Sequence, residues 1–593
     1  LIIFIKIKIM KTFEKLNYKR PNFKLYSKKF NFLLELFKNS NTFAEQDKIF
    51  QKINKLNSNF NSQKQICEIR YNCNTLDSFY DTENEYFDNI GPKIDAIHDL
   101  FNKALLNSNF KNEFSEKYGK QLFLLLEISL KTFSEFILNE LQEENRLNSE
   151  HTKIIAQAKI NYNENIYNLS SIEVFQENSD REIRKKSAFA KTNWYLENKD
   201  KLEQLYDDMV HLRHKIALKL GYNNFVELGY DRMYRTYGPK EVANFRELIR
   251  KYICPIAANL IERQKRRLNV DKLKFYDESF WFQSGNAMPF GNILEKSSQM
   301  FHELSKETGK FYDFMIDKKL LDLDSRDGKS TGGFCDFIEK YKYPFIFCNF
   351  TGTSEDIDVF NHEFGHAFQV YCSRNLINAW PTYDVCEIHS MSMEFLLWPW
   401  MELFFKNPDK YKFSHLASCI LFLPYCVAVD EFQHFVYENP DCSKMERNTA
   451  WRKIEEKYMP WIDWDGIKFL ENGGNWMVKA HIFTSPFYYI DYGLAQICAF
   501  QFWQRDQLNF DISKLRTCKL SDIITTYYQF KNSRKENWNN YLNLCKAGGS
   551  KSFMESLELG KLNSPFEENC FVSIIREIEN WLNSVNDSQM NFT

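Results

Sequence analysis

The segment Asp358–Gln369 contains the motif His-Glu-Phe-Gly-His, with His362 and His366 at its ends. On an α-helix this spacing places two imidazoles one turn apart on one face, which restricts how the segment can fold. Neutral imidazoles suit Zn²⁺, and the Glu363 carboxylate between them can accept a proton from a water at the metal. The motif predicts a zinc site built on a helix, with a second segment needed to complete it.

Two signals around the motif support a helix, and Gly365 indicates a close approach to its backbone. Ser354 and the acidic residues Glu355 and Asp356 are typical of a helix N-terminus. Gly365 is placed in mid-helix, where glycine costs about 1 kcal/mol relative to alanine, and this suggests that something approaches the backbone closely, as in a tightly packed metal site. Apolar residues also recur at helical spacing: Ile357, Phe360, Phe364 and Phe368.

A third zinc ligand is expected from a second helix. Glu387 lies 25 residues after His362, and Glu394 follows on the same helical face. We predict Glu387 as the ligand of a single Zn²⁺ ion per chain. Glu394, Asp384 and Asp358 are predicted to be acceptors that orient the ligating imidazoles.

Further motifs occur in a fixed order along the chain. The zinc motif is followed by Glu387-Ile-His-Ser-Met-Ser-Met-Glu394, Leu423-Pro-Tyr425 with Asp430-Glu-Phe-Gln433, and His481-Ile-Phe-Thr-Ser-Pro-Phe-Tyr-Tyr-Ile-Asp-Tyr492, and is preceded by Arg213–Tyr222, Thr331–Phe337 and Pro344–Thr353. This set, from about Arg181 to about Trp538, resembles the oligoendopeptidase F branch of the thimet oligopeptidase family. The resemblance implies a cytosolic zinc metalloendopeptidase that cuts short peptides in a deep channel between two mostly helical lobes.

The resemblance also implies roles for individual residues. His362, His366 and Glu387 match the zinc ligands of the family, and Glu363 matches the general base. The groups expected around the scissile carbonyl are His481, Tyr489 and Tyr492. The spacing from the histidine to the tyrosines differs by about one residue from the thimet-type pattern, so Tyr488 could exchange roles with Tyr489.

Composition agrees with an intracellular enzyme. The chain has 77 Lys and Arg against 79 Asp and Glu, so it has no excess of positive charge that would favour binding to nucleic acid or to an acidic membrane surface. The 14 cysteines contain no Cys-x-x-Cys pair, which favours reduced thiols and a cytoplasmic location over disulfides. We expect a monomer that acts on short peptides and has neither a nucleic-acid partner nor a membrane partner.

Apolar residues recur at helical spacing through nearly the whole sequence, and 593 residues are too many for one simple hydrophobic core. We therefore predict a mainly α, two-lobed metallopeptidase. Residues 10–170 form an N-terminal helical lobe that builds one wall of the channel, and residues 171–593 form the catalytic region. Residues 1–9 precede Met10-Lys-Thr-Phe, which resembles an ordinary start, and are interpreted as an upstream extension that is not native.

A small β-sheet is expected beside the zinc helix. Gly332–Phe337 and Pro344–Phe350 are short β-rich runs separated by polar residues. The free edge of such a sheet could accept an extended peptide through main-chain hydrogen bonds, whereas a hairpin that only packs against the helix is the alternative. Gly352 and Thr353 would close the strand, and we predict that they contact substrate.

Two other functions fit the same motifs. A zinc exopeptidase of this fold would trim one end of a peptide, and a scaffold could retain the metal without turnover. The remaining helical histidines, His211, His214 and His415, are predicted to be ordinary surface or hydrogen-bonded residues.

Overall fold

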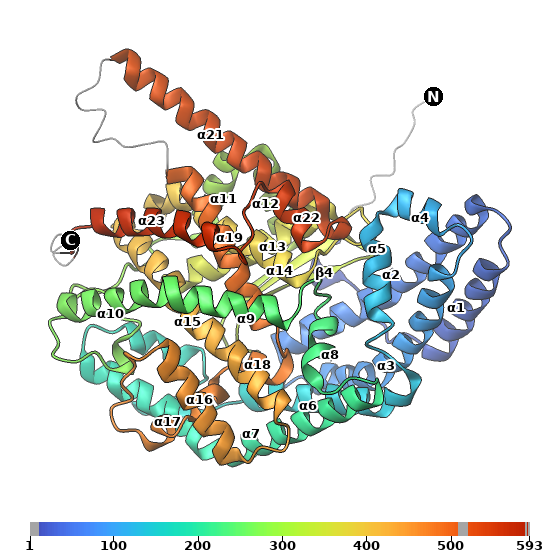
Figure 1. Cartoon of the computed structure of the whole chain (residues 1–593), viewed down its shortest axis with the longest axis horizontal. Helices are drawn as coiled ribbons and strands as arrows, with labels where there is room; N and C mark the ends of the chain where they lie inside the picture. Colours follow the sequence, from blue (N-terminus) through green and yellow to red (C-terminus); the bar gives the residue numbers. More distant parts are fainter. Residues whose placement is uncertain (1–10, 508–519, 588–589, 591–593) are drawn as a thin grey trace.

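The computed structural model describes residues 11–507, 520–587 and 590 of the chain. The predicted extension, residues 1–9, lies outside the described residues. Within them the chain is mainly helical with two small sheets, which confirms the predicted fold class (Figure 1).

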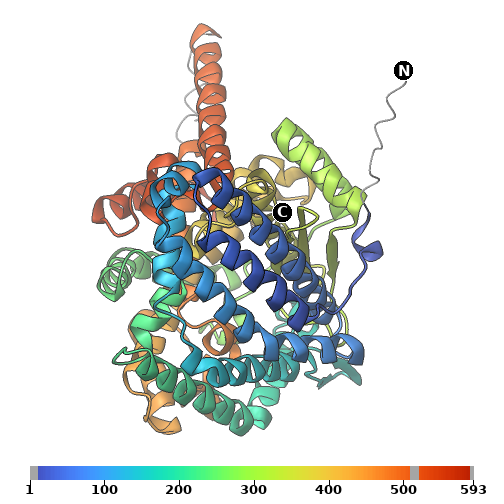
Figure 2. The same cartoon turned by 90° about the vertical axis from the view of Figure 1, so that its right-hand side faces the viewer.

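The N-terminal lobe is a group of helices with a hydrophobic core of its own, drawn in blue in Figures 1 and 2. Its buried side chains extend from Tyr26 to Phe123. Leu147 and Ile155, on the last helix of the group, pack into the larger core of the rest of the chain. The helices are α1 (Phe23–Lys38), α2 (Phe43–Cys73), α3 (Ser78–Leu106), α4 (Lys111–Tyr118), α5 (Lys120–Ser129) and α6 (Leu138–Ala156).

The rest of the chain surrounds the larger core. Its helices are α7 (Arg181–Lys219), α8 (Phe225–Arg232), α9 (Pro239–Leu248), α10 (Cys254–Leu268), α11 (Ile293–Leu304), α12 (Lys306–Lys318), α13 (Glu355–Ser373), α14 (Tyr383–Leu396), α15 (Pro408–Glu438), α16 (Lys444–Tyr458), α17 (Lys468–Glu471), α18 (Ala480–Thr484), α19 (Tyr489–Gln507), α21 (Leu520–Ala547), α22 (Phe553–Leu559) and α23 (Glu568–Ser584). By length and composition α15 could cross a membrane, but 78% of its apolar window is buried inside the protein, as in a core helix.

The predicted sheet is present and has one strand more than expected. β4 (Phe334–Ile338) and β5 (Tyr343–Phe350) form the predicted antiparallel hairpin. The third strand, β3 (Leu321–Asp324), pairs with β5 in parallel, so the order β3-β5-β4 leaves β4 at an edge. A separate hairpin joins β1 (Ile160–Tyr162) to β2 (Asn165–Tyr167). Neither β3 nor this second hairpin was predicted.

Gly365 allows α14 to lie directly against α13. A β-carbon added to Gly365 would lie 2.8 Å from the His389 carbonyl oxygen and 2.8 Å from the Ser390 α-carbon. Both contacts are with backbone, which cannot move aside as a flexible side chain can. The close approach inferred from the sequence is therefore the approach of α14, the helix that carries Glu387.

Gly365→Ala is expected to destabilise the protein by about 1–3 kcal/mol, because the added methyl overpacks the contact between α13 and α14. Moving α14 would also displace Glu387, so zinc should be released at a lower chelator concentration than from the wild type. Thermal unfolding and zinc content during chelator titration measure the two effects. An unchanged melting temperature with unchanged zinc retention would show that the contact does not set the spacing of the helices.

Candidate metal centre and active site

Helices α13 and α14 bring the three predicted ligands to one point. The Nε2 atoms of His362 and His366 lie 3.2 Å and 3.3 Å from the same Glu387 carboxylate oxygen, Oε2. Glu387 is completely buried, and the three groups are close enough to share one metal ion. Two imidazole nitrogens and one carboxylate oxygen form the donor set of many catalytic zinc sites, which keep a further position for water. The residues present therefore fit Zn²⁺.

A chain of hydrogen bonds orients His362. Its Nδ1 lies 2.8 Å from Glu394 Oε1, and the other Glu394 oxygen lies 2.9 Å from Nε2 of His415. The Trp398 indole N–H, which can only donate, lies 3.1 Å from Nδ1 of His415. Nδ1 of His415 is therefore the acceptor, and the ring proton is on Nε2, facing Glu394. Glu394 in turn accepts from Nδ1 of His362, which leaves the Nε2 lone pair directed at the metal position.

His415 was predicted to be a surface or hydrogen-bonded helix residue rather than a ligand, and the structure shows it hydrogen-bonded. The sequence contains no signal that its partner is Glu394. It is on α15, outside the segments that contain the motif and the third ligand. Glu394, His415 and Cys419 also lie close enough together to resemble a second metal site. Because the Nε2 proton of His415 is directed at Glu394, we interpret this group as a hydrogen-bonded support and expect one zinc ion per chain.

The two aspartates predicted to orient the ligating imidazoles, Asp358 and Asp384, are hydrogen-bonded to other groups. Tyr411 donates to Asp358, whose Oδ1 is 3.9 Å from Nε2 of His415. Asp384 accepts from Thr382 Oγ1 at 2.5 Å and from the Val385 N–H at 2.8 Å. Of the three predicted acceptors, Glu394 is therefore the one that the described contacts place on a ligating histidine.

Glu363 faces the same cavity as the metal position. It is 5% exposed, and its Oε2 has no hydrogen-bond partner among the described residues. Burial raises the pKa of this carboxyl, and the two neighbouring histidines oppose the rise. Immediately before β4, a β-carbon added to Gly333 would lie 3.0 Å from Glu363 Oε1, so the glycine leaves room for the carboxylate. Glu363 is thus an uncommitted proton acceptor beside the metal ligands.

Two phenols and an imidazole complete this part of the cavity. The Tyr488 hydroxyl donates to Oε1 of Glu387, the oxygen not shared by the histidines. The rings of Tyr488 and Tyr492 are 5.1 Å apart, and the Tyr492 ring is 6.3 Å from that of His362. The His481 ring is 5.8 Å from that of Tyr492. Burial, with help from the nearby Lys479 charge, lowers the pKa of His481 to about 3, so its imidazole is neutral at physiological pH.

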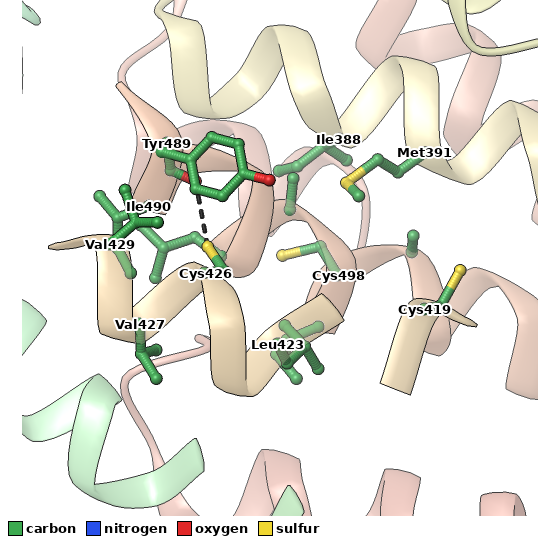
Figure 3. Close-up of a cluster of buried hydrophobic side chains, with 14 of the residues drawn as sticks. Ile388, Met391, Cys419, Leu423, Cys426, Val427, Val429, Tyr489, Ile490 and Cys498 are labelled. Carbon is green, nitrogen blue, oxygen red and sulfur yellow. Dashed lines mark hydrogen bonds between the residues drawn. The ribbon is translucent and has the colours of Figure 1, made fainter. Parts of the chain in front are cut away.

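The structure corrects the register of the tyrosines. Tyr489 is 6% exposed and belongs to a cluster of buried hydrophobic side chains (Figure 3), whereas Tyr488 and Tyr492 line the cavity. The Tyr489 ring lies 5.6 Å from the Phe422 ring, and the Tyr489 carbonyl oxygen accepts from Cys426 Sγ at 3.1 Å. Tyr488 lies immediately before α19, which begins at Tyr489. The two phenols that face the metal position, Tyr488 and Tyr492, are therefore four residues apart rather than three.

The cavity has a volume of about 1140 Å³ and lies between the two lobes. One wall comes from α2, α3 and α5, which are helices of the N-terminal lobe. The opposite wall is formed by β4, α13, α14 and the start of α19. In Figure 1 the blue helices lie beside the central elements α13, α14 and β4.

Gly352 and Thr353 are not among the residues that line this cavity. They form the turn between β5 and α13, where Gly352 has the positive φ of 92° that glycine adopts readily. The Asp356 carboxylate accepts the N–H groups of Thr351 and Gly352 at 2.9 Å and 2.7 Å. The Thr353 carbonyl oxygen accepts from the Asp356 N–H at 3.2 Å, so in the structure Gly352 and Thr353 both bond to the first turn of α13.

Replacing Glu387 and replacing Glu394 should have different effects on metal binding. Glu387→Ala removes a ligand atom and should abolish stoichiometric zinc binding. Glu394→Ala leaves the ligands but frees the His362 ring, so zinc affinity should fall about 10- to 100-fold. Zinc content after dialysis against graded chelator measures both variants, with one ion per chain expected in the wild type. Loss of zinc from Glu394→Ala together with retention by Glu387→Ala would reverse the two assignments.

Two family models and one curated relative match the chain. Residues 13–133 match the peptidase M3 N-terminal domain, and residues 174–570 match peptidase family M3. A curated relative, the oligoendopeptidase F homolog of Borreliella burgdorferi, is 22% identical over 408 residues, which span 66% of this chain and 63% of the relative.

Solved structures resemble nearly the whole chain. PZ peptidase A with an inhibitor has a TM-score of 0.92 and 48% identity, covering 97% of this chain and 100% of its own. A candidate oligoendopeptidase F from Bacillus anthracis has a TM-score of 0.88 and 45% identity, covering 98% of this chain and 99% of its own. The family match, which extends over more than half of the sequence, shows that the chain belongs to peptidase family M3.

Proposed function

We propose that the protein is a zinc-dependent oligoendopeptidase that hydrolyses internal bonds of short peptides. The observation that carries the proposal is the convergence of His362, His366 and Glu387 on one point inside a cavity that Glu363 also faces. Family membership supports a peptidase, and the position of the phenols supports catalysis rather than metal storage.

The metal and the residues that hold it have separate tasks. When bound by His362, His366 and Glu387, a zinc ion would supply Lewis acidity to a substrate carbonyl and to a water molecule. Glu394 fixes the ring of His362, and the Tyr488 hydroxyl fixes the second oxygen of Glu387. These contacts hold the ligands in one orientation before substrate arrives.

Glu363 moves the protons. As water attacks the carbonyl carbon, Glu363 takes the proton that the water loses, and it delivers this proton to the amine as the C–N bond breaks. No covalent acyl-enzyme is formed. Tyr492, with Tyr488 and the neutral His481 beside it, donates to the oxygen on which negative charge develops.

The edge strand supports binding of an extended peptide. Phe334, Cys335 and Phe337 of β4 line the cavity, as does Gly333 just before it, and β4 is an edge strand of its sheet. Main-chain hydrogen bonds along such an edge depend little on the amino-acid sequence of the peptide, whereas the two cavity walls limit the size of the substrate. An unfolded peptide fits this space and a folded domain does not.

We also propose that the protein is a monomer located in the cytoplasm. The cytoplasmic location is supported by the free thiols of every described cysteine.

Internally quenched peptides of graded length with both ends blocked test the proposal. Cleavage of short blocked peptides, falling with increasing length and absent from a Glu363→Gln preparation, is the expected result. Trimming of free-ended peptides alone would indicate an exopeptidase, and bound zinc without any turnover would indicate a scaffold.

A further inference from the structure

Phe487, the residue before Tyr488, has an unusual backbone conformation. Its φ is 66°, in the left-handed region that glycine tolerates and that a bulky residue adopts only when its surroundings impose it. The side chain is completely buried. Because α19 begins two residues later, the conformation of Phe487 determines the direction in which Tyr488 and the first turn of α19 leave this point.

Side chains from distant parts of the sequence bind both backbone polar groups of Phe487. Its N–H donates to Oε1 of Gln433 at 2.8 Å. The Gln433 amide donates through Nε2 to the Val429 carbonyl at 3.2 Å, which fixes Oε1 as the acceptor. The Phe487 carbonyl oxygen accepts from the Arg235 guanidinium. The strained residue is therefore held at both its donor and its acceptor.

The same guanidinium nitrogen of Arg235 reaches a second point on α19. It donates to Oδ1 of Asp491 at 2.6 Å, and the side chains of this ion pair are each 1% exposed. Tyr237 also donates to Asp491 Oδ1, at 3.4 Å. Arg235 thus connects the carbonyl immediately before Tyr488 with the carboxylate immediately before Tyr492.

The Phe487 ring is confined as closely as its backbone. A β-carbon added to Gly229 would lie 2.4 Å from Cδ2 of the ring. The rings of Tyr230 and His434 lie 5.4 Å and 5.2 Å from that of Phe487. The ring leaves no room for the residue to turn back to ordinary helical geometry without repacking its neighbours.

We infer that Arg235 is a positioning residue for the two active-site phenols, an inference that rests on the proposed function. Arg235 does not line the catalytic cavity; it borders a separate cavity together with Tyr237. It acts through Phe487 and Asp491, by holding the turn from which Tyr488 and Tyr492 project. Its contribution to turnover therefore depends on the phenols being present.

A double-mutant cycle tests the inference. Replacing Arg235 alone would leave the Asp491 carboxylate buried without its cation, so the variant of choice is Arg235→Met combined with Asp491→Asn, which removes both charges. With zinc supplied in excess, this pair should be metal-loaded and melt near the wild-type temperature, while kcat falls about 10-fold or more and KM changes less than about threefold. In a background that lacks both phenol hydroxyls, Tyr488→Phe with Tyr492→Phe, the same pair should lower kcat by less than about threefold.

Gln433 provides an independent pair of variants, which decides the matter if the first pair does not fold. Gln433→Met removes the acceptor of the Phe487 N–H, whereas Gln433→Glu keeps it. We expect a loss of kcat for the first, recovery with the second, and little further loss for the first in the background that lacks both phenol hydroxyls.

Two outcomes would overturn the inference while leaving the proposed function intact. One is wild-type kcat in either disruptive variant with normal zinc content. The other is a loss of kcat that multiplies fully with that of the Tyr488→Phe/Tyr492→Phe double variant, which would mean that Arg235 acts independently of the phenols. A wild-type protein that binds zinc but cleaves no blocked peptide would overturn both the function and the inference.

Discussion

Glu363→Gln is expected to lower kcat by about 10⁴-fold, the upper end of the range for loss of a general acid–base group. The amide has nearly the shape of the carboxylate but cannot accept the proton of the attacking water. Glu363 contributes no atom to the point shared by the three metal ligands, so zinc content should stay at one ion per chain. Its carboxylate oxygen Oε2 has no described partner, so folding should also be little affected.

Steady-state cleavage of a blocked peptide, measured beside zinc analysis and thermal unfolding of the same preparation, checks this expectation. Turnover within about tenfold of wild type in a zinc-loaded Glu363→Gln protein would remove Glu363 from the proton-transfer role. A loss of zinc would instead mean that the carboxylate belongs to the metal site.

Tyr492→Phe should lower kcat about 10²- to 10³-fold with little change in KM, because a phenol that donates to the developing oxyanion stabilises the transition state more than the bound peptide. The substitution removes one oxygen and retains the ring. Zinc binding should be unchanged, since Tyr492 contributes no ligand.

Tyr489→Phe is the matched control. It removes the same atom one turn away, from a ring packed in the core (Figure 3), and should leave kcat within about threefold of wild type. Tyr488→Phe should weaken zinc binding as well as turnover, because its hydroxyl contacts Glu387. Large losses of kcat in both Tyr492→Phe and Tyr489→Phe would restore the pair predicted from the sequence, whereas wild-type kinetics in Tyr492→Phe would remove Tyr492 from the site.

Local periodicity is the reason why the metal centre could be predicted. His362 and His366 are related by the helical repeat, and Glu387 follows on the next helix of the chain, so their identification requires only short-range geometry. Gly365 indicated a close approach to the backbone of α13, and in the structure it is α14 that makes this approach. The mainly α fold followed from the same periodicity over longer segments.

The tyrosine register could not be predicted for a local reason. Residues three and four apart both share a helical face, and the choice between Tyr488 and Tyr489 depends on which face turns towards the metal. That direction is set by the left-handed Phe487, which is held by Arg235 and Gln433. A bulky residue with positive φ has no sequence signature, and its partners come from other parts of the chain.

Long-range contacts account for the other omissions. His415 reaches Glu394 from α15, and β3 joins the sheet by parallel pairing, for which a short segment carries little signal. Gly352 and Thr353 were placed correctly at the end of a strand, but they lie in the turn before α13 and outside the cavity lining.

The order of the active-site residues along the chain has a consequence for biosynthesis. The wall formed by α2, α3 and α5 leaves the ribosome first, the metal ligands follow on α13 and α14, and the phenols at the start of α19 come last. At roughly 5–20 residues per second, synthesis of the segment from Glu387 to Tyr492 takes about 5–20 s. During that interval the metal ligands have been synthesised, but the groups that stabilise the transition state have not. The enzyme therefore becomes competent to cut peptides only after the start of α19 has been made.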